Sequence, residues 1–258
     1  PLVPEPMGAA HAGEAATAAV DHLIDTWDAE AIAALDPEDY YDFQVNRPRV
    51  VLDEGRRRIS WRTTRILLAT TPGIDRDVIL VQGIEPSFRW RAFTIELMEF
   101  AQQVGVTTVF ALGALMADVA HTRPIPVTAT SDNDDVLHRY DLEPSKYEGP
   151  TGIVGVLADA ATQAGLQSIS CWAAVPHYAG HSPSPKATLG LISKLEELLD
   201  APIPHSDLPE TARASASRQP DDLSQMGQRS PGGGRDVGLH RRLVEAERQV
   251  PAPLPEQP

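Results

Sequence analysis

The chain has 258 residues and a formal net charge of −14, because 36 Asp and Glu residues outnumber 22 Lys and Arg residues. This acidic balance disfavours nucleic acid and anionic membranes as partners, since both are bound through clustered basic residues. Hydrophobic residues make up 42% of the chain, which is enough for a sizeable core. No apolar run reaches the roughly 18 residues of a membrane-spanning helix, and the first six residues lack the features of a signal peptide. We therefore expect a cytoplasmic protein.

In chain order, an Ala-rich stretch over residues 13–27 predicts a helix with one apolar side. Residues 49–52 and 58–61 flank the turn sequence Asp53-Glu54-Gly55, which predicts a small hairpin insertion. Residues 65–70 and 77–82 predict two strands, and the second is apolar on both faces, as a buried parallel strand is. A helix is predicted over residues 86–104, with Pro86 in its first turn.

Strands are predicted next over residues 106–112 and 124–130, followed by a helix over residues 151–165 and a strand over residues 168–175. Residues 185–200 give the clearest helix signal, with Ser184 as its N-cap and Pro185 as its first residue. Alternating strands and helices in this order predict an α/β fold with a mostly parallel sheet covered on both faces. We expect residues 1–210 to form a single α/β domain.

Residues 211–258 differ from the rest, because they contain no Ile, Phe, Tyr, Trp or Lys and are rich in Pro, Gly and Arg. Such a segment buries too little apolar surface to offset the entropy lost on ordering. We expect a C-terminal tail that is mostly disordered or packs on a partner.

A polar motif follows the predicted strand at residues 77–82. Gly83-Ile84-Glu85-Pro86, with Trp90 beyond it, lies where open α/β sheets bind ligands, at the carboxyl end of a strand. Glu85 could orient an arginine or bind a substrate amine. In the structural alternative, the segment is a tight turn and Glu85 interacts favourably with a helix dipole.

Two further loops carry polar side chains. His121 and Arg123 are two residues apart and could hold a carboxylate or phosphate, although Arg123 could equally pair with Glu85 or with a backbone carbonyl. His177 and Tyr178 follow the strand at residues 168–175, where His177 could serve as a general acid or base or simply hydrogen-bond a loop. His181 is four residues on, but without a third ligand the pair makes a weak zinc site, and we predict no metal.

The chain lacks the glycine-rich sequences that bind dinucleotides or nucleoside phosphates and the Gly-x-Ser-x-Gly of many hydrolases, so no cofactor is predicted. Its single cysteine, Cys171, lies in an apolar run and is interpreted as a core residue. The ligand-binding candidates are Gly83, Glu85, Trp90, His121, Arg123, Tyr147, His177 and Tyr178.

Four short motifs occur in a fixed order along the chain. They are Gly83-Ile84-Glu85-Pro86 with Trp90, Gly113 with His121-Thr122-Arg123-Pro124, Tyr147-Glu148-Gly149-Pro150-Thr151-Gly152, and Val175-Pro176-His177-Tyr178. Over about residues 8–205 this order resembles the proteasome assembly chaperone family named after the second eukaryotic chaperone, in its bacterial (actinobacterial) branch. The resemblance implies a three-layer α/β/α sandwich like that of nucleoside phosphorylases and peptidyl hydrolases. It also implies homo-oligomers, often trimers, and relatives that help to assemble proteasome α-subunits, but no established reaction for the bacterial branch.

The two ends of the chain depart from the family pattern. Family members open with an apolar strand, whereas the first residues here include Pro1, Pro4 and Pro6, which make a poor central strand. The C-terminal segment lacks the charged helices that the family has there.

Two functions are consistent with these features. The first is a non-enzymatic binding and assembly protein whose acidic surface contacts a partner, plausibly a proteasome-related protein. The second is a small-molecule binder or enzyme in which Glu85, Arg123 and His177 converge, with Arg123 holding an anion and His177 working as acid or base. Side chains more than about 10 Å apart could not act on one reacting centre, so proximity discriminates between the two.

Overall fold

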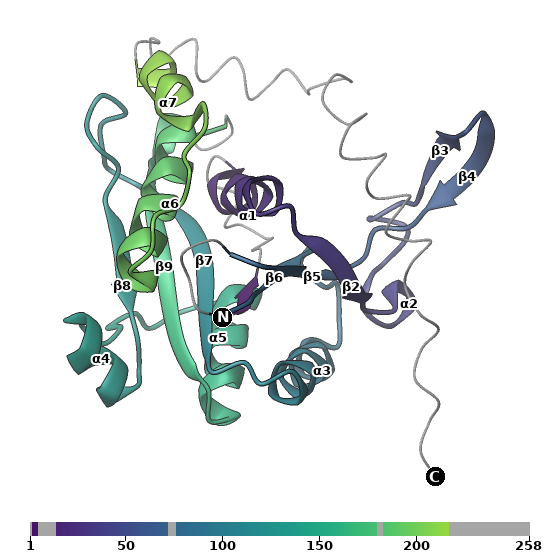
Figure 1. Ribbon diagram of the computed structural model, residues 1–258, viewed down its shortest axis with the longest axis horizontal. Helices are drawn as coiled ribbons and strands as arrows, with labels where there is room; N and C mark the ends of the chain where they lie inside the picture. Colours follow the sequence, from purple (N-terminus) through teal and green to yellow (C-terminus); the bar gives the residue numbers. More distant parts are fainter. Residues whose placement is uncertain (1, 5–13, 72–75, 180–182, 217–258) are drawn as a thin grey trace.

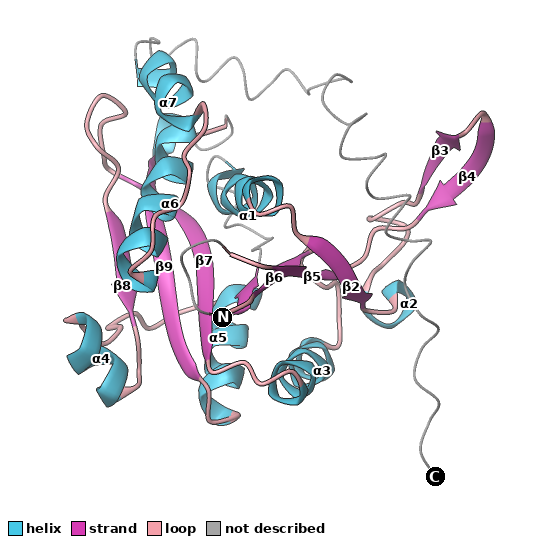
Figure 2. Ribbon diagram, viewed as in Figure 1, coloured by secondary structure: helices cyan, strands magenta, loops and turns pink. Residues whose placement is uncertain are grey.

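The computed structural model describes residues 2–4, 14–71, 76–179 and 183–216 (Figure 1). Its strands are β1 (Leu2–Pro4), β2 (Glu30–Ala34), β3 (Arg49–Asp53), β4 (Arg56–Ser60), β5 (Arg65–Ala69), β6 (Val78–Gln82), β7 (Thr108–Ala117), β8 (Val127–Thr130) and β9 (Gln167–Pro176). Its helices are α1 (Ala15–Thr26), α2 (Pro37–Tyr40), α3 (Trp90–Gln103), α4 (Asp134–Tyr140), α5 (Ile153–Gln163), α6 (Pro185–Leu199) and α7 (Leu208–Ala216), with a 3₁₀ turn over His177–Ala179. The chain thus has a mixed α/β fold (Figure 2).

Seven of the described strands form one sheet in the order β2-β5-β6-β1-β7-β9-β8. The centre is parallel, because β1 pairs in parallel with both β6 and β7, and β7 pairs in parallel with β9. At the two sides, β2 pairs antiparallel with β5, β5 with β6, and β8 with β9. The expectation of a mostly parallel sheet is therefore not confirmed, and the sheet is mixed.

The short connection from β5 to β6 explains part of this difference. β5 ends at Ala69 and β6 begins at Val78, so fewer residues join them than the dozen or so that a parallel crossover needs. Every residue of β6 is nonetheless buried, as expected for a strand covered on both faces.

Helices cover both faces of the sheet and define two separate cores (Figure 1). On one face, buried residues of α1 and α6 pack on β5, β6, β7 and β9, with α7 lying against α6. On the other face, buried residues of α3 and α5 pack against the same strands. The layers expected from the alternation of strands and helices are thus present around a mixed sheet.

The hairpin at residues 49–60 is confirmed. β3 and β4 pair antiparallel, and Glu54 and Gly55 form the two-residue turn, with φ of 49° and 78°. Two consecutive left-handed residues give the turn the twist that joins antiparallel strands, which is why Gly55 suits the second position. The hairpin forms its own two-stranded sheet and projects from the body of the protein (Figure 1).

Three expectations are corrected by the structure. Leu2–Pro4 forms the central strand β1 despite its prolines, with Pro4 at the last position, where few ladder bonds are lost. Helix α3 begins at Trp90 rather than near Pro86, because Arg89 adopts a left-handed conformation with φ of 59°. Residues 211–216, expected in the tail, belong to α7, where Ala212 is buried; residues 217–258 lie outside the described residues.

Candidate functional site

The segment after β6 is held by contacts along its length. Gly83 fits so closely against Thr64 that a Cβ there would lie 2.6 Å from the Thr64 Cα atom. The Tyr41 hydroxyl donates to the Ile84 carbonyl at 3.0 Å, and the Trp90 indole N–H donates to the Pro86 carbonyl at 2.6 Å. Gly83 and Trp90, which the sequence offered as ligand contacts, therefore shape this turn.

Glu85 reaches across to another helix. Its Oε1 atom accepts the backbone N–H of Ile153 at 2.9 Å, at the first residue of α5. The N-cap of α5 is Gly152, which has no side chain to bond the free N–H groups of the first turn. Glu85 supplies that cap from 68 residues away, and its negative charge also favours the positive end of the helix dipole.

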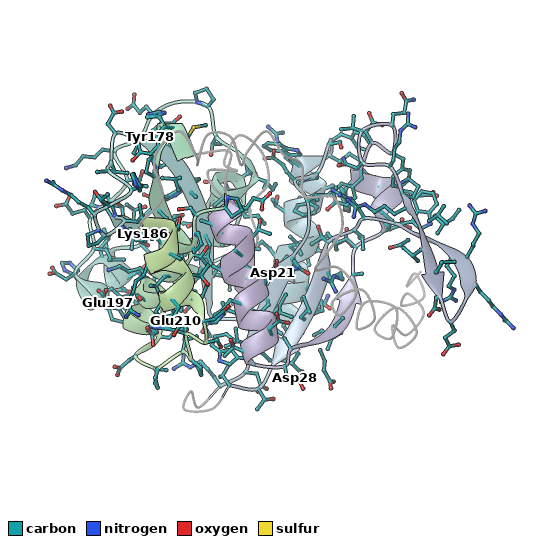
Figure 3. The ribbon with its side chains drawn as sticks, turned by 90° about the horizontal axis from the view of Figure 1, so that it is seen from above. Asp21, Asp28, Tyr178, Lys186, Glu197 and Glu210 are labelled. Carbon is teal, nitrogen blue, oxygen red and sulfur yellow. The ribbon has the colours of Figure 1, made fainter. Side chains whose placement is uncertain are left out.

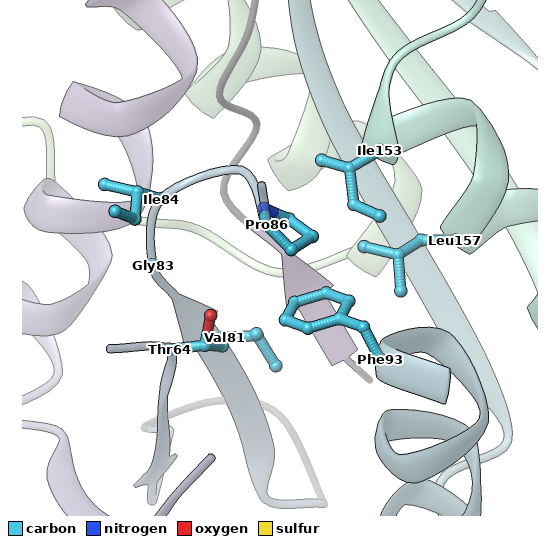
Figure 4. Close-up of a pocket in the computed structure, with 8 residues that line it drawn as sticks. All are labelled: Thr64, Val81, Gly83, Ile84, Pro86, Phe93, Ile153 and Leu157. Atoms are coloured by element: carbon cyan, nitrogen blue, oxygen red, sulfur yellow. The ribbon is translucent and has the colours of Figure 1, made fainter. Parts of the chain in front are cut away.

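A small pocket lies beside this segment (Figure 4). It measures about 230 Å³, open solvent included, and is lined by Thr64, Val81, Gly83, Ile84, Pro86, Phe93, Ile153 and Leu157. The lining is mostly apolar, and the Thr64 hydroxyl already bonds the Tyr41 hydroxyl at 2.5 Å. The enclosed part of this space is about 10 Å³, the room that one water molecule needs, so the pocket as it stands holds no small-molecule ligand.

A buried polar bridge lies next to the turn. Gln82, the last residue of β6, donates to the Asp21 carboxylate of α1 and accepts from the Arg65 guanidinium of β5. Burial raises the pKa of Asp21 to about 6. The bridge ties two strands to α1, and no local sequence pattern predicts it, because the three residues lie far apart along the chain.

The loop after β7 forms a second polar group. The Tyr178 hydroxyl accepts the backbone N–H of His121 at 2.9 Å and lies 2.7 Å from its Nδ1 atom, and the two rings meet edge to face. From the first turn of α6, the Lys186 ammonium donates to the carbonyls of His121, at 2.6 Å, and of Arg123. Figure 3 shows Tyr178 and Lys186 on neighbouring elements of the fold.

Lys186 sits at the end of α6 where a cation is least favoured, since the helix dipole is positive there. Burial lowers the pKa of its amine. Two backbone carbonyls compensate for both effects, so Lys186 fastens the loop at residues 118–124 to α6.

His177 and Arg123 lie at the outer side of this loop. The His177 Nε2 atom is 3.7 Å from an Asp118 carboxylate oxygen, and both side chains are largely exposed. Arg123 is also exposed, and no described residue bonds its guanidinium. The predicted pairing of Arg123 with Glu85 is therefore absent among the described residues, and His181 lies outside them.

Tyr147 stands apart from both groups. Its side chain is 69% exposed, and its hydroxyl donates to the Pro150 carbonyl at 2.9 Å. The ring lies over Gly149, where a Cβ would come 2.7 Å from the Tyr147 hydroxyl. Tyr147 thus braces the turn that leads to α5.

The candidate residues therefore fall into separate groups. Glu85 follows β6, whereas His177 follows β9, and β1 and β7 lie between those two strands. At about 4.8 Å per strand, the two strand axes are about 14 Å apart. The structure brings His121, Tyr178 and Lys186 together and joins Glu85 to α5 instead.

Two features are absent from the part of the chain that the structure describes. No group of three or more His, Cys, Asp or Glu side chains there could hold a metal ion. None of its helices is long and apolar enough to cross a lipid bilayer.

The protein is of the layered α/β class. Its mixed sheet is covered by helices on both faces and has polar loops at the carboxyl ends of its central strands. Residues 7–219 match the PAC2 family, so the chain belongs to that family. This confirms the resemblance seen in the four sequence motifs. A search of curated proteins found no match.

Solved structures of similar proteins include two from actinobacteria. A PAC2 family protein from Streptomyces avermitilis is 48% identical with a TM-score of 0.81, and the alignment covers 94% of this chain and 98% of that one. A proteasome-assembly chaperone homologue from Mycobacterium tuberculosis is 40% identical with a TM-score of 0.76, over 93% and 98% of the two chains. An archaeal homologue of proteasome-assembly chaperone from Pyrococcus furiosus, 18% identical with a TM-score of 0.62 over 88% and 93%, shares the fold.

Proposed function

We propose that this chain is a non-enzymatic protein-binding module that works in the cytoplasm as a homo-oligomer, a trimer being the expected form, with a proteasome-related protein as partner. Membership of the PAC2 family supports this proposal, as does the 40% identity to a protein described as a proteasome-assembly chaperone homologue. The proposal requires no chemistry at the polar loops.

The observation that carries the proposal is the bond from Glu85 to α5. A carboxylate that caps a helix through a 2.9 Å bond to the Ile153 N–H is committed to the fold and is poorly placed to act on a substrate. Lys186 is similarly occupied by two backbone carbonyls. The neighbouring pocket encloses room for about one water molecule, which is too little for a metabolite.

The alternative is a small-molecule binder or enzyme that uses Glu85, Arg123 and His177. One observation favours it: the Arg123 guanidinium is exposed and has no partner among the described residues, which leaves it available to an anion. Such a role would involve the loop at residues 118–124, about three strand spacings away from Glu85.

The test is native mass spectrometry of the protein purified without denaturation from its own cells. We expect a proteasome subunit to co-purify at fixed stoichiometry with a homo-oligomer of this chain. A bare chain that carries a small bound mass would contradict the proposal and favour the alternative. Loss of that mass in both Arg123→Ala and His177→Ala, but not in the exposed control Arg139→Ala, would then locate the ligand.

A further inference from the structure

Exposed apolar side chains gather on the hairpin of β3 and β4. Twelve large hydrophobic side chains of the described residues are exposed, and five of them lie between residues 45 and 61. These five are Val45 (77%), Val50 (58%), Leu52 (73%), Ile59 (60%) and Trp61 (43%). Exposed apolar side chains that adjoin one another mark interaction sites, whereas single scattered ones do not.

Three of these side chains share one face of the hairpin. Val50 and Leu52 are two residues apart on β3, so they point the same way, and Ile59 is the cross-strand partner of Val50. Arg57 is the partner of Leu52 and completes this face. The face therefore presents an apolar strip with a positive charge at its outer end.

The hairpin gains little support from its own subunit. None of its residues belongs to either hydrophobic core, and its two strands form a sheet separate from the main one. An isolated two-stranded hairpin is at best marginally stable in water and needs further apolar contact. The base of the hairpin is anchored where the Trp61 ring packs on Phe43, with centroids 4.6 Å apart.

The charge of the hairpin is opposite to that of the rest of the chain. Residues 49–62 contain five Arg and two acidic residues, a net charge of +3, so the remaining residues carry −14 − 3 = −17. All five arginines are exposed: Arg49, Arg56, Arg57, Arg58 and Arg62. The acidic body of a second copy of this chain therefore carries charge complementary to that of the hairpin.

We propose that the β3–β4 hairpin is an arm that docks on the acidic body of a second copy of this chain, burying Val50, Leu52 and Ile59 there. The inference rests on the homo-oligomer proposed above and names the surface that forms it. Two hairpins do not pair with each other, because each carries +3 and like charges repel. The contact therefore joins two different surfaces, the hairpin of one copy and the body of another.

Photo-crosslinking of a mixed-isotope sample tests the arm directly. Cys171 is fully buried and burial raises its pKa to about 12, so Leu52→Cys provides the reactive thiol of the described fold. Benzophenone-maleimide is attached at this position, chains of natural isotope content are mixed with ¹⁵N-labelled chains, and the irradiated sample is digested. We expect mixed-isotope adducts that join the hairpin peptide to an acidic segment of the other copy.

The matched control is Met116→Cys, labelled in the same way. Met116 is 41% exposed at the end of β7, outside the hairpin, and should give few mixed-isotope adducts. Equal adduct yields from the two positions would overturn the proposal.

Sedimentation of two variants measures the strength of the contact. Leu52→Asp and Arg57→Glu should each raise the dissociation constant of the oligomer by about tenfold or more, as expected for central interface residues. Met116→Asp should leave it unchanged. Both hairpin variants should keep the thermal midpoint of the isolated subunit, because the hairpin lies outside the two cores.

The outcomes separate this inference from the proposed function. If the unmodified chain sediments as an oligomer but the hairpin variants sediment identically, the arm is refuted and the homo-oligomer stands. If the unmodified chain sediments as a monomer at every concentration, both the arm and the homo-oligomer are refuted.

Discussion

Removing the Glu85 carboxylate should destabilise the protein at the start of helix α5, to which Glu85 itself does not belong. In Glu85→Ala, the N–H of Ile153 loses its 2.9 Å acceptor, and Gly152 has no side chain to replace it. Loss of an N-cap costs about 0.5–2 kcal/mol, and loss of a negative charge at the helix dipole costs about 0.3–1 kcal/mol. We expect a loss of about 1–2 kcal/mol in the free energy of unfolding. Glu85→Gln keeps an acceptor oxygen and should lose only the smaller, dipole part.

A second substitution distinguishes a lost cap from general damage. Gly152 has φ of −93° and ψ of −174°, a conformation that any N-cap residue adopts, so aspartate fits its backbone. A Cβ at this position would lie 3.2 Å from the Glu85 Oε1 atom, and a second carboxylate would repel the first. Gly152→Asp should therefore destabilise the unmodified protein but stabilise Glu85→Ala, where the clash is gone and the cap is missing.

Urea unfolding of the four proteins of this cycle, followed by circular dichroism, gives the coupling free energy between the two positions. We expect it to favour the double variant by about 1 kcal/mol or more, since residues in contact are not additive. An unchanged stability of Glu85→Ala, or a double variant no more stable than Glu85→Ala alone, would refute the capping role.

Three further results are expected. Because burial raises the pKa of Asp21 from 3.8 to about 6, its contribution to stability is fully present below pH 3.8 and is lost as the pH rises through 6. Asp21→Asn should flatten this slope in urea unfolding between pH 4 and 7.5 and stabilise the protein at pH 7.5 by up to about 3 kcal/mol; an unaltered slope would contradict the assignment. Gly83→Ala should cost about 1–3 kcal/mol, because the new Cβ meets the Thr64 backbone at 2.6 Å. Gly155→Ala is the control, because its nearest contacts are side-chain atoms of Thr151 rather than backbone, and it should cost less than Gly83→Ala. Equal thermal midpoints for the two would show that the contact with the Thr64 backbone is unimportant. Cys171 should react with a thiol reagent at pH 8 only after denaturation, and rapid labelling of the native protein would show that the strand β9 is not buried as described.

Elements with a local signal could be predicted from the sequence. The turn at Glu54-Gly55 specified the hairpin, and Ser184 and Pro185 placed the start of α6 at the residue where the structure has it. In both cases the information lies within a few residues of the element, in backbone preferences that do not depend on the rest of the fold.

Features that depend on distant residues could not be predicted in this way. Nothing near Glu85 indicates that its partner is the N–H of Ile153, and the motif was interpreted as a ligand site or as part of its own helix start. The prolines near Leu2–Pro4 predict a poor central strand, whereas the segment's place in the sheet depends on β6 and β7, the two strands with which it pairs. The short connection between β5 and β6 favours antiparallel pairing of these two strands. The hydrophobic periodicity of the strands alone does not contain this information.

The place of β1 in the sheet has a consequence for how the protein is made. Leu2 pairs with both Ile79 and Val109, so β1 is synthesised well before the two strands that flank it. At about 5–20 residues per second, translation reaches Val109 only about 5–20 s after Leu2. During that interval β1 lacks one of its two neighbours, so the centre of the sheet closes late. The centre of the sheet is thus assembled from segments that are made far apart in time, which places its completion late in folding on the ribosome.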